Sequence, residues 1–314
     1  MSTRQFAILL VLCCLFNLAD RPVHAQGDPP AMPQITLNVD GVERTYRLFV
    51  PSTYNTPAPL VIAFHGAGGD GASMARLTTF NRLAESAGVI VAYPEGLLVY
   101  WDYGVGTPEW AEQSPVHDEI SFISAMLDQL ANDYTIDPTR IYAVGFSNGA
   151  RMAFRVGCEF SDRISKIAAV SATISSEITE NCPTDARVSV LYMHGTGDDV
   201  TPWAGKPLYD EGGSLISYAL SAPDTVNFWL EQNGCPADTT MLDMPDANPD
   251  DEITVRQAHF TGCENGHEVV FYAVIGGSHA WEGGIFNLMP SDYAPSASAT
   301  EYVWAFLGFE PYNP

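Results

Sequence analysis

The pattern G-x-S-x-G is filled by residues 145–149, with Ser147 at its centre. By chance the pattern arises in on the order of one in ten chains of this length, so its surroundings decide its meaning. Here an apolar run, residues 140–145, leads into the motif, and a helical pattern, residues 148–157, follows it. Such a tight strand-to-helix turn holds a serine above the sheet as a nucleophile, whereas an ordinary glycine-rich turn is the alternative. We predict that Ser147 is a nucleophile.

A serine hydroxyl is a weak nucleophile at neutral pH until a base takes its proton. The histidines downstream of Ser147 are His194, His259, His267 and His279. His279 follows an apolar run, residues 269–275, through a short glycine-containing link, and parallel sheets place their sites at the carboxyl ends of strands. His267 precedes that run and would lie at the opposite edge, and His259 lies in an extended segment. We predict that His279 is the general base.

In folds that use this serine turn, the order along the chain is serine, acid, histidine. The apolar run of residues 188–193 continues through His194 and a glycine-rich link to Asp198 and Asp199, so either carboxylate follows a buried strand. The acid would hold the tautomer of the catalytic histidine and stabilise its imidazolium without taking the proton itself. The residues alone do not separate Asp198 from Asp199.

Two backbone N–H groups are expected to stabilise the negative oxygen that forms when a serine attacks an ester. One belongs to Asn148, directly after the nucleophile, and the other to Ala67, in the glycine-rich loop of residues 65–69. Glycine lets this backbone come close to a carbonyl oxygen. The loop lacks the lysine and the glycine spacing of nucleotide-binding loops. The sequence therefore favours an oxyanion hole over a phosphate site, and it predicts neither a metal nor a cofactor.

The elements that must position these residues alternate along the chain, after a β-hairpin predicted for residues 35–50. Apolar runs predict strands at residues 60–64, 89–93, 140–145, 166–170, 188–193 and 269–275. Helical patterns predict helices at residues 73–87, 116–134, 148–157, 214–232 and 300–307. Apolar runs without polar alternation belong to strands buried on both faces. We predict an α/β fold in a single domain, residues 34–314, with a mostly parallel central sheet flanked by helices on both faces.

The first 25 residues have the form of a signal peptide, with Arg4 before an apolar run too short to span a bilayer and a cleavage site after Ala25. A retained membrane anchor is the alternative. Residues 26–33 read as a flexible leader rich in Pro and Ala. The chain has 38 acidic and 14 basic residues and a net charge of −24, which repels nucleic acid and anionic membranes. We expect a secreted monomer that binds neither of them.

Removal of the signal peptide leaves an even number of cysteines: Cys158, Cys182, Cys235 and Cys263. An even number in an exported chain suggests two disulfides. The pairing that is local in sequence, Cys158–Cys182 and Cys235–Cys263, is one of three possible pairings. A zinc site is disfavoured because the sequence contains no C-x₂-C pair among them.

Two tryptophans lie near the expected site in sequence. Trp101 is in a loop after a predicted strand, and Trp281 is two residues past His279. Most aromatic side chains in a large α/β core only fill volume. These two are nevertheless predicted to line the substrate cleft, where they would suit an aromatic acyl group or the face of a sugar.

Motifs spread from residue 44 to the C-terminus carry a resemblance to a known family. They are Tyr46-Arg-Leu-Phe-Val-Pro51, Pro59-Leu-Val-Ile-Ala-Phe-His-Gly66, Tyr93-Pro-Glu-Gly96, Asp118-Glu-Ile-Ser-Phe-Ile123, Ile136-Asp-Pro-Thr-Arg-Ile-Tyr142, residues 145–149, His194-Gly-Thr-Gly-Asp198, Cys235 with Cys263, and Gly277-Ser-His-Ala-Trp281. With them the chain resembles the secreted feruloyl esterase and polyhydroxybutyrate depolymerase group of the α/β-hydrolase superfamily. In that group's H-G-T-x-D pattern the acid is the fifth residue, with a proline four positions beyond it. Asp198 and Pro202 fit this frame and Asp199 does not, so the resemblance selects Asp198 as the acid.

The resemblance implies an α/β-hydrolase fold and a serine carboxylic-ester hydrolase that works through an acyl-enzyme. A feruloyl or acetyl esterase acting on plant cell-wall polysaccharide such as xylan is the first expectation, and a polyhydroxybutyrate depolymerase is the alternative within the same chemistry. A catalytically silent binding protein on the same fold is a third hypothesis. The intact set of Ser147, Asp198 and His279 disfavours it, because silent relatives usually lose a member. An ester substrate is the partner that this implies.

Overall fold

In the described part of the chain, ten strands form one sheet and two more form a separate hairpin. The computed structural model describes residues 32–104, 118–209, 213–245, 252–284 and 298–310. The predicted signal peptide, residues 1–25, lies outside these ranges, as does most of the predicted leader.

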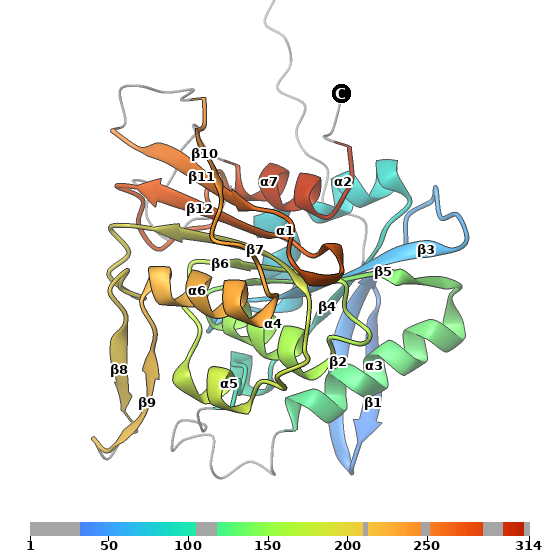
Figure 1. Cartoon of the computed structure of the whole chain (residues 1–314). Coiled ribbons are helices and arrows are strands. Elements are labelled where there is room, and N and C mark those ends of the chain that lie inside the picture. Colours follow the sequence, from blue (N-terminus) through green and yellow to red (C-terminus); the bar gives the residue numbers. More distant parts are fainter. Residues whose placement is uncertain (1–31, 105–117, 210–212, 246–251, 285–297, 311–314) are drawn as a thin grey trace, which may run out of the picture. The chain divides into compact units, whose positions relative to one another are not determined.

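The sheet is mostly parallel (Figure 1). Its strands are β1 (Gln34–Val39), β2 (Val42–Phe49), β3 (Ala58–Phe64), β4 (Ile90–Pro94), β5 (Ile136–Phe146), β6 (Lys166–Val170), β7 (Ser189–Gly195), β10 (Thr240–Asp243), β11 (Thr254–Phe260) and β12 (Val269–Ile275). Their order in space is β1-β2-β4-β3-β5-β6-β7-β12-β11-β10. The strands from β4 to β12 in this order pair in parallel, and both ends of the sheet continue in antiparallel pairs. The prediction of a mostly parallel α/β sheet is confirmed.

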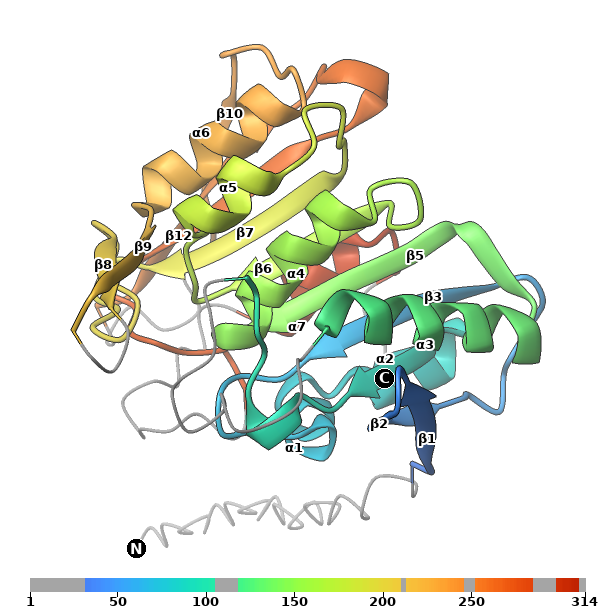
Figure 2. The same cartoon turned by 90° about the horizontal axis from the view of Figure 1, so that it is seen from below.

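Helices cover both faces of this sheet (Figures 1 and 2). They are α1 (Gly71–Thr78), α2 (Phe80–Ala87), α3 (Glu119–Asp133), α4 (Asn148–Glu159), α5 (Ser176–Asn181), α6 (Ala222–Gln232) and α7 (Ala299–Phe306), with short 3₁₀ turns at Leu97–Val99 and Glu264–Gly266. Side chains of α1, α2 and α7 pack into one apolar cluster, and those of α3, α4, α5 and α6 pack into the other. Each helix therefore buries one apolar face against the sheet, which stabilises both elements.

The central strands are buried on both faces, which explains their continuous apolar runs. Every residue of β3 and of β7 is buried. In β3, Ile62 and Phe64 contribute to one apolar cluster, while Val61 and Ala63 contribute to the other, on the opposite face of the sheet. Successive side chains of a strand point to opposite faces of the sheet, and here both faces are apolar. The sequence of the strand therefore shows no alternation of apolar and polar residues.

Several elements differ from the sequence-based predictions, and α5 and β8 (Lys206–Tyr209) were not predicted at all. The helix predicted for residues 73–87 is two helices, because Thr79 adopts a left-handed conformation with φ of 53° and ends α1. The first part of the helix predicted for residues 214–232 is strand β9 (Leu215–Ala219), which pairs with β8. The hairpin of β10 and β11 at the edge of the sheet was not predicted as a pair of strands.

The two disulfides join the cysteines that are local in sequence, one of the three pairings that the sequence left open. Cys158, in α4, is bonded to Cys182, directly after α5, and Cys235, after α6, is bonded to Cys263. Disulfides of this kind are typical of proteins that fold in an oxidising compartment. No helix within the described ranges is long and apolar enough to cross a membrane.

Candidate active site

Ser147 occupies the turn between β5 and α4 with φ of 54° and ψ of −120°, an unfavourable conformation for a residue with a side chain. Gly149 makes this turn possible, because a Cβ there would lie 2.3 Å from the carbonyl oxygen of Phe64 in the neighbouring strand. The backbone N–H of Ser147 donates to Val170 at the end of β6. The serine is therefore held at the carboxyl end of the parallel strands, as the nucleophile turn requires.

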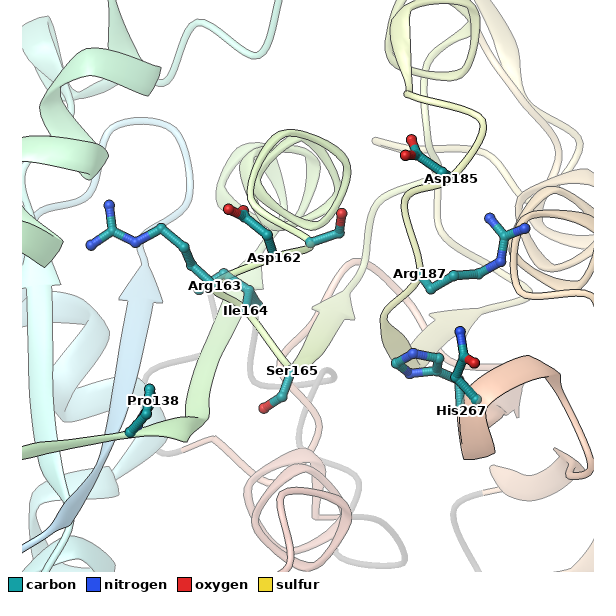
Figure 3. A pocket seen from close by; sticks show the side chains of 10 residues that line it. Pro138, Asp162, Arg163, Ile164, Ser165, Asp185, Arg187 and His267 are labelled. Atoms are coloured by element: carbon teal, nitrogen blue, oxygen red, sulfur yellow. The ribbon is translucent and has the colours of Figure 1, made fainter.

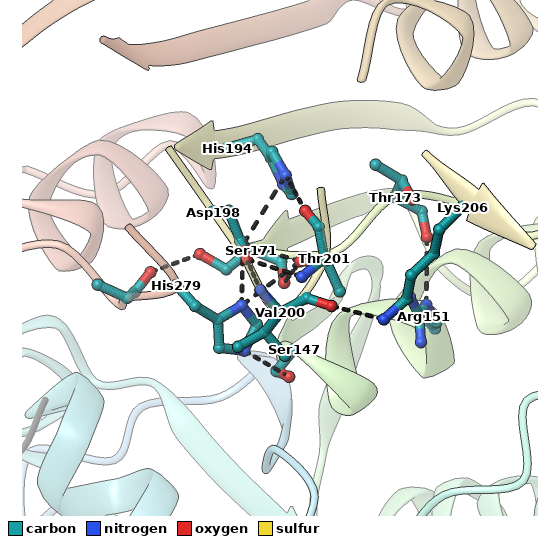
Figure 4. Close-up of polar contacts among 11 residues, drawn as sticks. Ser147, Arg151, Ser171, Thr173, His194, Asp198, Val200, Thr201, Lys206 and His279 are labelled. Atoms are coloured by element: carbon teal, nitrogen blue, oxygen red, sulfur yellow. Dashed lines mark hydrogen bonds and ion pairs between the residues drawn. The ribbon is translucent and has the colours of Figure 1, made fainter. Parts of the chain in front are cut away.

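His279 lies between the serine and a carboxylate (Figure 4). Its Nε2 is 2.9 Å from Ser147 Oγ, and its Nδ1 is 2.8 Å from Asp198 Oδ2. Because a carboxylate only accepts, Nδ1–H donates to Asp198, and Nε2 is left as the acceptor of the serine proton. The structure thus brings together the three side chains that the sequence predicted as nucleophile, base and acid.

The loops that carry the acid and the histidine fit closely against each other. The backbone N–H of Gly197 donates to the carbonyl of Gly277 over 2.8 Å. A Cβ at Gly195 would lie 2.3 Å from the same carbonyl oxygen, so only glycine allows this approach. Ser171 Oγ donates to the carbonyl of Ala280, next to the histidine, over 2.6 Å. One side-chain and one backbone hydrogen bond, from the residues that follow β6 and β7, therefore fix the loop that carries the imidazole.

Asp198 is fully enclosed and well supplied with donors. Its side chain accepts hydrogen bonds from the backbone N–H groups of Val200 and Thr201 and from Thr201 Oγ1, besides that from His279. Burial alone would raise the pKa of Asp198, but the bonds from His279 and Thr201 outweigh it and hold the pKa below its ordinary value. Asp199 is exposed. The geometry thus agrees with Asp198, rather than Asp199, as the partner of the histidine.

Two residues that support the acid were not predicted from the sequence to do so. Thr201 bonds both carboxylate oxygens of Asp198, and its carbonyl accepts a hydrogen bond from His194 Nε2 over 2.8 Å. Burial lowers the pKa of His194, and the charge of Asp198 opposes this only in part, so His194 is neutral at pH 7. A threonine three residues after an aspartate is a recognisable signal for such a turn, since these short polar side chains bond nearby backbone.

The two predicted oxyanion donors face no competing acceptor. Among the described residues, neither the backbone N–H of Ala67 nor that of Asn148 donates a hydrogen bond. Asn148 is the first residue of α4, where the helix dipole also favours negative charge. A Cβ at Gly66 would lie 3.4 Å from Ser147 Cβ, so the glycine loop runs directly beside the nucleophile. This placement agrees with the predicted role of both groups.

Trp101 and Trp281 do not line a cleft, which corrects the prediction from sequence. Both indoles are fully buried. Trp101 donates from Nε1 to the carbonyl of His65. Its backbone N–H donates to Asn148 Oδ1, and its carbonyl accepts from Asn148 Nδ2. Trp281 donates to Thr300 Oγ1. Both residues belong to the packed interior beneath the site, because nearness in sequence to a catalytic loop does not fix the direction of a side chain.

A cavity of about 250 Å³ opens beside the triad. We call it the α1 cavity; its walls are the loop of residues 65–69, Ser73, Met74 and Leu77 of α1, Phe146 and His279. The ring of Phe146 lies 5.4 Å from the imidazole of His279, centroid to centroid. The cavity therefore connects the triad to an apolar helix face.

A larger cavity, of about 470 Å³, lies near the amino ends of strands β6, β7 and β12, whereas the triad lies at the carboxyl ends of the strands; Figure 3 shows its lining. His267 lines it together with Arg163 and Arg187. Both arginines are ion-paired, with Asp128 and Glu264 respectively. His267 thus lies at the edge where the sequence predicted it, away from the serine. In the ranges that the structure covers, no group of three or more His, Cys, Asp or Glu side chains is placed to hold a metal ion.

Known proteins are similar to this chain in sequence or in fold. A family described as Phospholipase/Carboxylesterase matches residues 47–210. The chain is 31% identical to the putative esterase NocK of Nocardia uniformis subsp. tsuyamanensis over 81% of its own length and 75% of the relative. It is 26% identical to feruloyl esterase C of Emericella nidulans over 91% of its own length and 96% of that protein. The solved acetyl xylan esterase from Aspergillus awamori, 13% identical, matches its fold with a TM-score of 0.56 over 88% of this chain and 100% of that one.

Proposed function

Because the chain belongs to the Phospholipase/Carboxylesterase family, we propose that it is an exported serine esterase that removes feruloyl or acetyl groups from plant cell-wall polysaccharide. Ser147 is the nucleophile, His279 the general base and Asp198 the orienting acid. The observation that carries the proposal is the continuous hydrogen-bonded line from Ser147 Oγ through His279 to Asp198, at 2.9 Å and 2.8 Å.

The first half of the reaction forms an acyl-enzyme. His279 Nε2 takes the proton of Ser147 Oγ as this oxygen bonds to the ester carbon. The carbonyl oxygen becomes an oxyanion, which accepts hydrogen bonds from the N–H groups of Ala67 and Asn148. Loss of one such donor typically raises the barrier by about 3–4 kcal/mol. The bond to the alcohol oxygen then breaks, and this oxygen takes the proton from the imidazolium of His279.

The second half frees the acid. A water molecule enters where the alcohol has left, gives its proton to His279 Nε2 and bonds to the acyl carbon. The bond to Ser147 Oγ breaks, and the serine recovers its proton from the imidazolium. Asp198 stays ionised throughout and stabilises the positive ring, which agrees with the pKa that its hydrogen bonds from His279 and Thr201 hold below the ordinary value.

The relatives support the choice of substrate. The match to the protein named feruloyl esterase C covers 96% of that protein and 91% of this chain. Its net charge of −24 disfavours anionic polymers as substrates and leaves neutral polysaccharide accessible.

Export and a simple organisation belong to the same proposal. Residues 1–25 are the signal peptide, residues 26–33 a leader and residues 34–314 one catalytic domain that acts as a monomer. Two disulfides agree with an extracellular protein.

The test is the release of product from matched substrates. Purified protein should free acetate from acetylated xylan or ferulate from a feruloylated xylan oligosaccharide, while the S147A variant should free neither. Clearing of a polyhydroxybutyrate emulsion without action on either polysaccharide ester would replace this function with that of a polyester depolymerase.

A further inference from the structure

The α1 cavity has His279 of the triad in its wall and is lined on another side by side chains of α1. The loop with the N–H of Ala67 and the imidazole of His279 form its polar mouth, and Met74, Leu77 and Phe146 form its apolar walls. We propose that this cavity binds the acyl group of the ester, that Leu77 limits the size of that group, and that the cavity selects apolar acyl groups such as acetyl over feruloyl. The proposal rests on the proposed function and names the preferred substrate class within it.

Volume assigns the cavity to the acyl group rather than to the alcohol. At about 250 Å³ it is slightly smaller than the range of roughly 300–1,000 Å³ that drug-sized ligands occupy. A polysaccharide alcohol continues beyond the ester bond as a chain and cannot end in such a space. The acyl group ends within a few bonds of the reacting carbon, so it is the part of the substrate that fits.

Two helix residues shape the apolar wall. Met74 and Leu77 lie three positions apart in α1 and therefore on one face of the helix. Met74 is almost fully buried, whereas Leu77 is partly exposed. A Cβ at Gly284 would lie 2.9 Å from Leu77 Cδ1, so Leu77 also packs against the turn that follows His279. Leu77 thus forms the part of the cavity wall that lies between the helix and the histidine loop.

The helix that carries this wall is fixed in place. Asp70 accepts from the N–H of Ser73, and Ser73 Oγ accepts from the N–H of Asp70, which forms a capping box. The N–H of Gly71 donates to Glu95 over 2.8 Å. Because caps hold both the start and the direction of α1, Leu77 cannot withdraw to admit a larger group without distorting the helix.

The polar side chains in the wall are already engaged. Ser73 Oγ accepts from the N–H of Asp70 and donates to its carbonyl. His65 Nε2 accepts from the N–H of Gly96, and its Nδ1 donates to the carbonyl of Gly66. Among the described residues of the wall, no side chain outside the triad has a donor left, and one lone pair of Ser73 Oγ is the acceptor that remains. A feruloyl ring hydroxyl could donate to this lone pair, but its own oxygen would lose water without a replacement side-chain donor, which is unfavourable.

The test separates acyl from alcohol specificity. Esters of one alcohol, p-nitrophenyl acetate, butyrate and hexanoate, are compared in the wild type, L77A and L77F. We expect L77A to raise kcat/KM for hexanoate relative to acetate by about four-fold for each additional methylene admitted, and L77F to lower the same ratio. The matched control is L242A, which truncates a half-exposed leucine on the edge strand β10. It should leave the ratio unchanged.

A second comparison tests the polarity of the cavity. Wild-type protein should hydrolyse methyl cinnamate with a kcat/KM about ten-fold or more above that for methyl ferulate. Equal or faster hydrolysis of the ferulate would overturn the preference. The assignment of the cavity would be overturned if the ratio of kcat/KM for hexanoate to that for acetate stayed within two-fold of wild type in both Leu77 variants while fluorophosphonate labelling was intact. It would also be overturned if the variants changed kcat/KM only in a series of acetate esters in which the alcohol varies. Failure of the proposed function is a distinct result, in which the wild type frees neither acetate nor ferulate from the polysaccharide, whatever the acyl ratios of the Leu77 variants are.

Discussion

Thr201 holds both carboxylate oxygens of Asp198: its backbone N–H lies 2.7 Å from Oδ1, and its hydroxyl lies 2.8 Å from Oδ2. The same hydroxyl is 3.4 Å from His279 Nδ1 and 3.1 Å from the carbonyl of Ser171. Thr201 is therefore a positioning residue for the acid. It acts on the reaction only through Asp198 and His279.

Replacing Thr201 by valine should slow the reaction and weaken the fold at neutral pH. Hydrogen bonds to charged groups contribute about 1.5–3 kcal/mol, so we expect T201V to lower kcat at least ten-fold. T201S, which keeps the hydroxyl, should recover most of the activity. As a control, T139V removes a similar bond between Thr139 and Asp137 on the surface and should leave kcat unchanged. A T201V enzyme with wild-type kcat would contradict this role.

The same variant has a defined pH dependence. The pKa of Asp198 is lowered in the folded protein, so its ionised form stabilises the fold above the ordinary aspartate pKa, and this contribution is lost as pH falls through the folded value. T201V raises the folded pKa and reduces the contribution. The difference in unfolding free energy between wild type and T201V, measured with urea, should be largest near pH 7 and shrink below pH 4. A difference that grows toward acid pH would refute the assignment.

The ion pair of Arg44 and Glu119 should matter for stability far more than those on the surface. Its atoms Nη2 and Oε2 are 2.5 Å apart, and both side chains are almost completely buried. We expect E119A to lower the unfolding free energy by about 3–5 kcal/mol, because it leaves the charge of Arg44 buried without a partner. R44M/E119M should lose less than E119A. The control D243A breaks the exposed pair with Arg256 and should lower the unfolding free energy by about 1 kcal/mol or less. A similar loss of unfolding free energy in E119A and D243A would contradict the prediction.

The disulfide between Cys158 and Cys182 should raise thermal stability without taking part in the chemistry. It closes a loop with a sequence separation of 24 and joins α4, which begins directly after Ser147, to the end of α5. C158A/C182A should lower the unfolding free energy by about 3 kcal/mol and leave kcat at 25 °C within two-fold. Calorimetry and steady-state kinetics on the same preparation check both parts. A large loss of kcat in a folded variant would mean that the bond positions the nucleophile.

Sequence patterns predicted the residues that follow buried strands because the carboxyl ends of parallel strands meet at one edge. This reasoning placed Ser147, Asp198 and His279 together, and it placed His267 at the far edge. The choice between Asp198 and Asp199 needed the resemblance to a family, since two adjacent residues share one strand end. Only the structure gives the physical difference, as Asp198 is enclosed by donors and Asp199 is exposed.

Other features depend on contacts between segments that are distant in sequence. The apolar period runs on through Thr79, so its left-handed conformation between α1 and α2 leaves no sign in the pattern. Residues 215–219 form strand β9, which pairs with β8, and this strand pairing overrides the helical spacing of the sequence. Trp101 and Trp281 were predicted to line the cleft because of their place in the chain, yet their side chains point into the core. The α1 cavity likewise joins a helix face to the loop of residues 65–69, the end of β5 and the loop of His279, which are distant in sequence.

The central claim is that His279 and Asp198 make Ser147 a strong nucleophile. Its most direct test is covalent labelling by a fluorophosphonate, followed by mass spectrometry of the labelled peptide. We predict a single adduct on Ser147 in the wild type, none in S147A, and labelling slowed by roughly ten-thousand-fold in H279A. A folded wild-type protein that stays unlabelled, or that carries the adduct on a different serine, would contradict the claim.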